Sequence, residues 1–276
     1  MAFGGENAES YYDEGLTASM KGDLDAAVKL FEKAIRLDHT MAAAYHQLGK
    51  CFMRMGRGQR AVELLEQVVQ KRPQLVPARL DLGFAFLELG RLDQARHQFD
   101  QVLALKPAES KAQLGLAQAA FYEGNWEGAM QQVQTALVHG SNSFPIQFLL
   151  GRAAKLAGNA PLADSSLKKA DRILEKTIEV DPEKPEPHFL RGEVRFVQEQ
   201  YTAALDHYRS AVEKSQPNRM YTAFGENFTL ADMLAKQGLC LQRLGQHDRA
   251  RAMGERVAEV DPNHPIGKTL RESSDE

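Results

Sequence analysis

A few short runs in the sequence carry residue types that could hold a phosphate or a dinucleotide. The run GRG at residues 56–58, with Ala61 after it, fits the glycine spacing of a dinucleotide-binding turn. That turn must follow a β-strand, and no strand pattern precedes residue 56. The run GKT at residues 267–269 fits the end of a phosphate-binding loop, but Pro262 stands where the loop needs its first glycine. Neither run therefore predicts a nucleotide site.

Candidate nucleophiles and metal ligands are equally isolated. A serine precedes a lysine by three residues at 165–168 and again at 166–169, as in serine–lysine enzymes, but no companion motif accompanies either pair. The eight histidines are scattered without a paired ligand spacing, and the chain has only two cysteines, Cys51 and Cys240. Metal sites need several such side chains at defined spacings. We therefore expect no catalytic residues, no metal, no cofactor and no enzymatic activity.

The composition argues against nucleic acid and the membrane interior as partners. Lys and Arg number 34 against 37 Asp and Glu, which gives a formal net charge of −3 and a pI of about 6.3. Nucleic-acid-binding proteins usually carry a basic excess, so we expect no nucleic-acid partner. No apolar run is long enough to span a membrane. The first ten residues lack the basic start and apolar core of a secretory signal, so we expect a cytoplasmic protein.

The stretch from residue 75 to residue 107 has the pattern of two amphipathic helices joined by a tight turn. Apolar residues such as Ala95 and Phe99 recur every three or four positions in its second half, which gives one apolar stripe. Gly90 separates the halves because glycine adopts the left-handed conformation that ends helices. Pro107 ends the second half because it has no amide hydrogen to donate. One helical hairpin cannot bury this much apolar surface, so it needs copies of itself on either side.

The copies follow at regular intervals. A small residue recurs at one reference position, namely Gly15, Gly49, Gly83, Ala117, Gly151, Gly192 and Gly238. The first four intervals are 34 residues and the last two are 41 and 46. An alanine follows twelve residues later in every copy, a turn glycine follows seven residues later except at Glu199, and a bulky residue follows sixteen residues later except at Gly254. Small residues let paired helices approach closely, and the bulky residue fills the space beside them.

This pattern resembles the tetratricopeptide repeat, a helix–turn–helix unit of 34 residues. The resemblance implies an all-α fold, a right-handed superhelical α-solenoid of about seven hairpins. We expect it to cover residues 8–264, after a polar lead at residues 1–7 and before a short cap with an acidic tail at residues 265–276. Cys51 and Cys240 stand where other copies have alanine, so each is predicted to be a small buried side chain. They lie five repeats apart, too far to form a disulfide.

The first of two insertions lies near residues 171–181. It keeps an apolar face in phase over seven additional residues, so we predict a second helix about two turns longer than its counterparts. Arg191 and Arg195 follow it and are one turn apart, as are Glu175 and Glu179 on the lengthened helix. These four residues either form a polar junction between the helices or lie separately in solvent.

The second insertion, at residues 217–230, is too apolar for a solvated loop. It contains Tyr221, Phe224 and Phe228, so we expect it to pack on the neighbouring repeats, in the groove or on another molecule. Only a short segment follows the last repeat. Because solenoids need a polar terminal cap, the last hairpin is expected to be partly exposed or to self-associate.

In proteins of this family, the first helices of successive repeats line the inside of the superhelix. The positions that commonly point into this groove, carried over to this sequence, are His46, Lys50, Met53, Arg54, Leu80, Phe84, Leu87, Lys111, Leu114, Phe121, Tyr122, Phe148, Arg152, Lys155, Phe189 and Phe196. They combine apolar with basic side chains, so the predicted partner is a protein or peptide segment with apolar anchors and acidic flanks. Alternatively, Phe84 and Phe121 belong partly to the core and the basic residues are ordinary solvated charges. A substitution at Arg54 is expected to leave the melting temperature nearly unchanged.

The predicted function is a non-catalytic scaffold or adaptor that binds a partner segment in this groove. One alternative is a self-assembling structural scaffold, joined through the insertion at residues 217–230 or through the last repeat. Another is a regulatory subunit that tethers an enzyme. The two-carboxylate clamp by which co-chaperones of this family hold acidic tails is not matched, because Pro77 and Asp81 occupy two of its positions.

Overall fold

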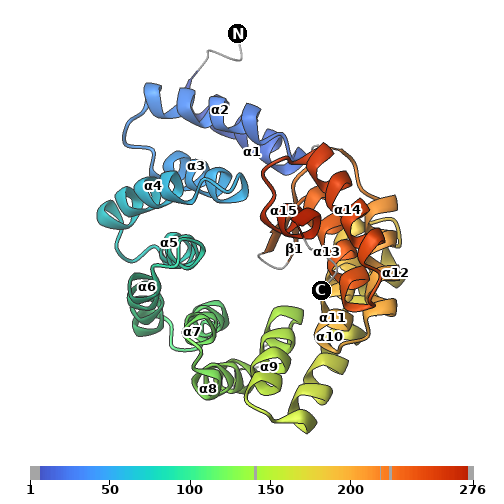
Figure 1. Cartoon of the computed structure of the whole chain (residues 1–276). Coiled ribbons are helices and arrows are strands. Elements are labelled where there is room, and N and C mark those ends of the chain that lie inside the picture. Colours follow the sequence, from blue (N-terminus) through green and yellow to red (C-terminus); the bar gives the residue numbers. More distant parts are fainter. Residues whose placement is uncertain (1–6, 140–141, 218, 224–225, 273–276) are drawn as a thin grey trace. The chain divides into compact units, whose positions relative to one another are not determined.

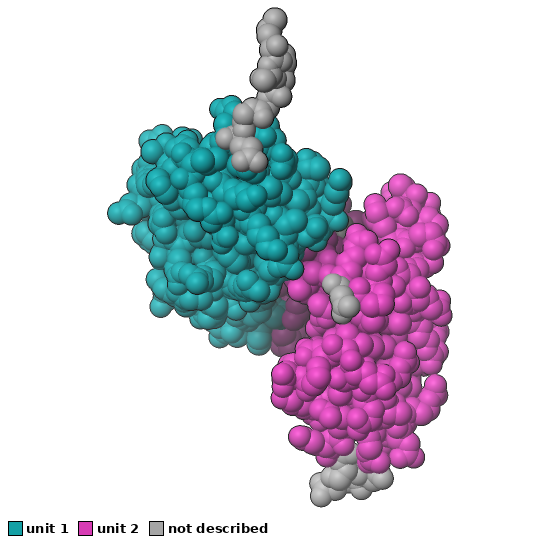
Figure 2. All heavy atoms as spheres, turned by 90° about the horizontal axis from the view of Figure 1, so that it is seen from above, with its two compact units in different colours: residues 1–141 teal, residues 142–276 magenta. Residues whose placement is uncertain are grey.

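The computed structural model describes residues 7–139, 142–217, 219–223 and 226–272 of the chain. Within these ranges the chain forms fifteen helices and one two-stranded sheet. They gather into two compact units, residues 1–141 and residues 142–276, which Figure 2 colours separately. The predicted all-α solenoid of helical hairpins is confirmed, and the small sheet is an addition to it.

Unit 1 consists of four helical hairpins. Their helices are α1 (Ala8–Lys21), α2 (Leu24–Leu37), α3 (Ala42–Arg54), α4 (Gly58–Lys71), α5 (Val76–Glu88), α6 (Leu92–Leu105), α7 (Ser110–Tyr122) and α8 (Trp126–Val138). The first helices of neighbouring hairpins touch one another, α1 with α3, α3 with α5 and α5 with α7. In Figure 1, α3, α5 and α7 accordingly lie on the inner side of this stack, and α4, α6 and α8 lie on its outer side.

Unit 2 consists of three hairpins, the sheet and a final helix. Its elements are α9 (Phe144–Leu156), α10 (Ala160–Val180), α11 (Pro185–Val197), α12 (Tyr201–Glu213), β1 (Tyr221–Ala223), β2 (Glu226–Phe228), α13 (Leu230–Arg243), α14 (His247–Val260) and α15 (Pro265–Glu272). The helix α10 has 21 residues, whereas the second helices α2, α4 and α6 each have 14. The predicted lengthening by about two turns is therefore confirmed.

The recurrent small residues allow the paired helices to approach closely, and the bulky residues fill the space beside them, as their spacing predicts. A Cβ atom added to Gly83 would lie 2.5 Å from a ring carbon of Phe99, closer than carbon atoms approach without a clash. Phe99 and Ala95 are fully buried beneath α5. Cys51 and Cys240 are buried and free, as predicted.

The turns between paired helices use the left-handed backbone conformation. The turn glycine Gly90 has φ 70°, and the glycines at equivalent positions have similar values. At the one exception, Glu199 adopts φ 63°, which is uncommon for a residue with a side chain. Its carboxylate Oε1 lies 2.7 Å from Nζ of Lys155 on α9, so an ion pair ties this turn to the preceding hairpin.

The last hairpin is closed by α15. Position 254 is a glycine instead of the bulky residue found in the other copies, which leaves the space beside Gly238 unfilled by α14. The side chain of Leu270 from α15 occupies that space, where a Cβ on Gly238 would clash with it. Leu270 is 1% exposed. The expectation of a partly exposed last hairpin is therefore wrong for this face, because the short terminal helix supplies the missing filler.

Candidate functional site

The first helices of unit 1 carry most of the predicted groove positions that remain accessible. Lys50 on α3, Lys111 on α7 and Tyr122 on α7 are exposed, and Tyr122 retains 60% of its accessible surface. Met53 and Phe84 are half-buried on α3 and α5. These five residues are called the inner patch below. They offer apolar surface and two ammonium groups to a partner.

Other predicted groove positions of unit 1 belong to its core. Leu80, Leu87, Leu114 and Phe121 are buried, and the Phe121 ring packs against Trp126 with 5.0 Å between ring centres. Even the half-buried Phe84 packs edge-on against Phe99 at 5.1 Å. The interpretation of Phe84 and Phe121 as partly core residues is therefore supported by their contacts.

His46 and Arg54 connect neighbouring hairpins. Nε2 of His46 lies 2.7 Å from a carboxylate oxygen of Asp81 on α5. Nη1 of Arg54 donates hydrogen bonds to the carbonyl and hydroxyl oxygens of Ser19 on α1, at 3.0 and 3.1 Å. These bonds link two hairpins, whereas the prediction that a substitution at Arg54 leaves the melting temperature nearly unchanged assumed a side chain without structural contacts. Of the three basic residues spaced one turn apart on α3, Lys50 is the exposed one.

The predicted groove positions of α9 and α11 are engaged by neighbours within unit 2. Phe148 is buried, with the Arg152 guanidinium 5.5 Å from its ring centre. Lys155 is held by Glu199 and by the carbonyl of Val197. Phe196 is half-buried. Lys155 is itself exposed, and both of its partners lie within unit 2.

The insertion at residues 217–230 covers another of these positions. The strands β1 and β2 pair antiparallel. The ring of Phe228 stacks on that of Phe189 with 4.1 Å between ring centres, and Tyr221 lies 5.9 Å from Phe228 on the same stack. All three aromatic residues are buried. The insertion thus packs on a neighbouring repeat, the first of the three expected possibilities, while Phe224 lies outside the described residues.

A polar junction joins α10 to α11. Nε of Arg191 donates to Asp171 at 2.8 Å and its Nη2 donates to Glu175 at 2.9 Å. Nη2 of Arg195 donates to the other oxygen of Asp171 at 2.7 Å. The predicted junction therefore exists and includes Glu175, but Asp171 and not the exposed Glu179 bridges the two arginines. The signal for Asp171 was its position one turn before Glu175 on the same helix face.

A histidine near the junction is kept neutral by its burial and by the charges of the junction. His207 lies on α12 and is half-buried. Burial, followed by the positive charges of Arg191 and Arg195, lowers the pKa of the His207 imidazole to about 4. His207 is therefore neutral at neutral pH and adds no positive charge to the junction.

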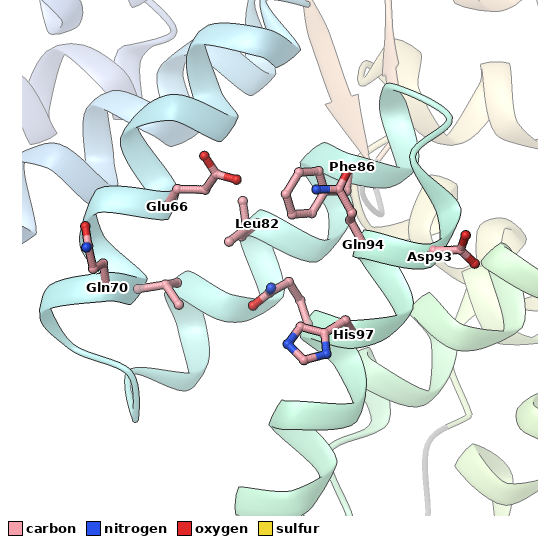
Figure 3. A pocket seen from close by; sticks show the side chains of 9 residues that line it. Glu66, Gln70, Leu82, Phe86, Asp93, Gln94 and His97 are labelled. Atoms are coloured by element: carbon pink, nitrogen blue, oxygen red, sulfur yellow. The ribbon is translucent and has the colours of Figure 1, made fainter.

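Shallow grooves run between the second helices of neighbouring hairpins. We call each a second-helix furrow: its walls are two successive second helices and its floor is the first helix between them. The α4/α6 furrow has a volume of about 400 Å³, with Leu82 and Phe86 of α5 at its floor and Glu66, Asp93 and His97 on its walls (Figure 3). The α2/α4 and α12/α14 furrows have similar volumes, about 420 and 450 Å³, and are lined from the same repeat positions.

None of the described helices has the length and apolar character needed to cross a lipid bilayer. The described side chains of His, Cys, Asp and Glu form no group of three that could hold a metal ion.

Sequence comparisons match the chain to models described as tetratricopeptide repeat. One model matches residues 18–74 and 52–104, a second matches residues 80–144 and 153–219, and a third matches residues 232–264. No curated protein sequence matches the chain.

Several solved structures share the fold. A tetratricopeptide repeat protein from Parabacteroides merdae is 17% identical with a TM-score of 0.62, over 96% of this chain and 98% of its own. In the Cut9–Hcn1 hetero-tetramer of the APC/C, the matched chain is 18% identical with a TM-score of 0.61, over 93% of this chain and 47% of its own. PilW, a type IV pilus biogenesis factor, is 15% identical with a TM-score of 0.55, over 84% of this chain and 99% of its own. At these identities the similarity concerns the fold alone.

Proposed function

The chain belongs to the tetratricopeptide repeat family, and from this premise we propose that it is a non-catalytic scaffold that binds a protein segment on the first helices of unit 1. Proteins of this fold act as interaction scaffolds. The observation that carries the finer proposal is the inner patch, where Lys50, Lys111 and Tyr122 are exposed on α3 and α7. We place this function in the cytoplasm.

The chemistry of the inner patch favours a segment with apolar anchors and acidic flanks. Met53 and Phe84 are half-buried and can cover an apolar side chain of the partner. Lys50 and Lys111 carry ammonium groups that attract carboxylates. Tyr122 adds an aromatic ring with a hydroxyl group, a combination common at interfaces. The segment can bind as an extended strip or as an amphipathic helix.

The inner patch is favoured over self-association for a specific reason. The two segments considered for self-association were the insertion at residues 217–230 and the end of the last repeat. Tyr221 and Phe228 of the insertion and Leu270 of α15 are all buried within unit 2. Their apolar side chains are therefore not available to a second copy of the chain.

The test is affinity capture from the native host with a folded variant of the inner patch. Lys50→Glu/Tyr122→Ala changes two exposed side chains, and circular dichroism verifies its fold. Lys106→Glu/Val138→Ala is the matched control, since both residues are exposed at the ends of second helices. A partner captured by the wild type and the control but lost by the inner-patch variant supports the proposal. A partner retained by all three proteins places binding elsewhere.

A further inference from the structure

The three second-helix furrows share their position in the repeat but differ in charge. The α2/α4 furrow is lined by two arginines and two glutamates, namely Arg57, Arg60, Glu32 and Glu63. The α4/α6 furrow has acidic side chains and a histidine, with no lysine or arginine among its lining residues. The α12/α14 furrow is lined by three arginines and a single carboxylate, namely Arg209, Arg249, Arg256 and Glu213. Charge, and not volume, therefore distinguishes the α12/α14 furrow.

The three arginines of the α12/α14 furrow are exposed and only weakly engaged. Nη1 of Arg209 lies 3.2 Å from Asp206 on its own helix, in a pair whose carboxylate is 65% exposed. Arg249 donates to the amide oxygen of Gln246, and Nη1 of Arg256 lies 3.9 Å from the sulfur of Met253. Neutral partners and an exposed carboxylate leave most of this positive charge available to a ligand.

The floor and walls of this furrow are apolar between the arginines. Leu205 of α12 and Leu241 of α13 are buried beneath it, and Val212 and Met253 are half-buried along it. Leu205 and Val212 are seven residues apart on α12, which corresponds to about 10 Å along the helix axis. The apolar strip therefore matches about two turns of a helix laid alongside.

We propose that the α12/α14 furrow is a second docking site, which binds an amphipathic α-helix of a partner protein through apolar residues flanked by carboxylates. Two helical walls can receive the side-chain ridge of a third helix, as in ordinary helix packing. Apolar residues spaced three and four apart on that helix cover Val212 and Met253, while its carboxylates reach the arginines on both walls. A nucleic-acid or lipid phosphate would use the arginines but leave the apolar strip unused. The site lies on other helices than the inner patch and does not depend on it.

A designed peptide tests the proposal directly. The probe is a fluorescein-labelled helical peptide of four turns with leucines at positions i, i+4 and i+7 and glutamates beside them. A matched peptide carries lysine in place of each glutamate, and a second carries alanine in place of each leucine. Fluorescence anisotropy with the full chain measures the three dissociation constants. We expect saturable binding of the probe, weakened about tenfold or more by either replacement, and weakened again by added salt.

Variants of the chain locate the binding. Arg249→Glu/Arg256→Glu is expected to weaken the probe about tenfold or more, because two attractions become repulsions. Arg172→Glu/Arg243→Glu makes the same total charge change at two exposed arginines outside the furrow and is expected to leave the dissociation constant within about twofold. Lys50→Glu/Tyr122→Ala is expected to bind the probe normally, which separates this site from the inner patch.

Three results would overturn the proposal. The first is the absence of saturable binding of the probe to the folded wild type. The second is equal binding by Arg249→Glu/Arg256→Glu, which would place the peptide elsewhere. The third is binding that does not require the leucines: the alanine peptide binds as tightly as the probe, or phosphatidylserine vesicles or short duplex DNA displace the probe at the same concentration of negative charge. Each of these outcomes would identify a general anion site instead of a helix-docking furrow.

Discussion

Removal of the Asp171 carboxylate is expected to destabilise unit 2 strongly. In Asp171→Ala, Arg191 and Arg195 lose the acceptor that they share, while their side chains remain mostly buried, with 16% and 22% exposed. Leaving a buried charge without its partner costs about 3–5 kcal/mol. Because both guanidinium groups retain some contact with water and Arg191 keeps Glu175, we expect a loss of about 2–3 kcal/mol in the free energy of unfolding.

An apolar replacement of the whole junction is expected to remove this loss. In the α4/α6 furrow the repeat positions of Asp171, Arg191 and Arg195 are occupied by apolar residues, namely Val69, Leu82 and Phe86. The triple variant Asp171→Val/Arg191→Leu/Arg195→Phe therefore introduces at the junction the side chains that pack together in the α4/α6 furrow. Replacing a buried ion-pair network by apolar residues is often neutral or stabilising by about 1–4 kcal/mol. We expect the triple variant to be at least as stable as the wild type.

Urea denaturation followed by circular dichroism measures both effects as changes in the transition midpoint at constant slope. Glu175→Ala is the matched control, because that carboxylate is 49% exposed and its pair with Arg191 is worth about 0–1 kcal/mol. Two results would refute the reasoning. One is an Asp171→Ala variant within about 0.5 kcal/mol of the wild type, which is the range of ordinary surface substitutions. The other is a triple variant less stable than Asp171→Ala.

Three further predictions concern packing and pH. Ala95→Phe is expected to cost about 1–3 kcal/mol or more by overfilling the α5/α6 contact, whereas Ala104→Phe on the exposed side of α6 should change the thermal midpoint little; equal midpoints would contradict the packing. Leu270→Ala is expected to cost about 2–5 kcal/mol because it empties the space under α15, against a small effect of Leu156→Ala, which is 55% exposed at the end of α9. The pKa of His207 is about 4 in the folded state and about 6.5 in the unfolded state. Because the unfolded state binds the proton more readily, His207 lowers the free energy of unfolding as the pH falls from about 6.5 toward 4, and has no such effect above about pH 6.5. His207→Gln should therefore flatten the fall in stability between pH 7 and pH 5 in urea titrations, and an unchanged slope would exclude the proposed cause.

The repeated part of the fold could be predicted from the sequence because each recurring position has one physical task. The close approach at Gly83 requires a small residue, because a Cβ there would clash with Phe99, and the fourth hairpin has Ala117 at this position. Such requirements return in every hairpin, so they appear as a period. The lengthened α10 was predictable for a related reason: whole helical turns leave the buried face unchanged.

Side-chain pairings between helices were harder to predict. The repeat period of the sequence shows which face of a helix is buried, but it does not show which residue of the neighbouring helix lies opposite each side chain. The polar junction was one of two alternatives left open for Arg191, and Asp171 was missed because the crossing of α10 and α11 decides which turn lies opposite. Leu270 was missed for a different reason. It belongs to no repeat, and only the absence of a bulky residue at Gly254 signalled that something must replace it.

Some residues of the candidate site were likewise predictable from the repeat, and others were not. The register of the repeat could assign Lys50 and Tyr122 to the face of the first helices, and both are exposed. It could not indicate that Phe189 would be covered, because Phe228 reaches it from an insertion with no counterpart in the other copies. Which groove positions remain accessible depends on these non-repeated segments.

The position of Leu270 has a consequence for the order in which the chain folds during synthesis. In the other glycine-anchored copies, the residue that fills the hairpin lies sixteen positions after the reference glycine, so the hairpin can close once its own second helix has left the ribosome. In the last copy the filler comes sixteen residues later still. At translation rates of about 5–20 residues per second, this delay lasts about 1–3 s. Until Leu270 is available the apolar space beside Gly238 has no filler, so the seventh hairpin cannot complete its packing before the helix α15 has formed.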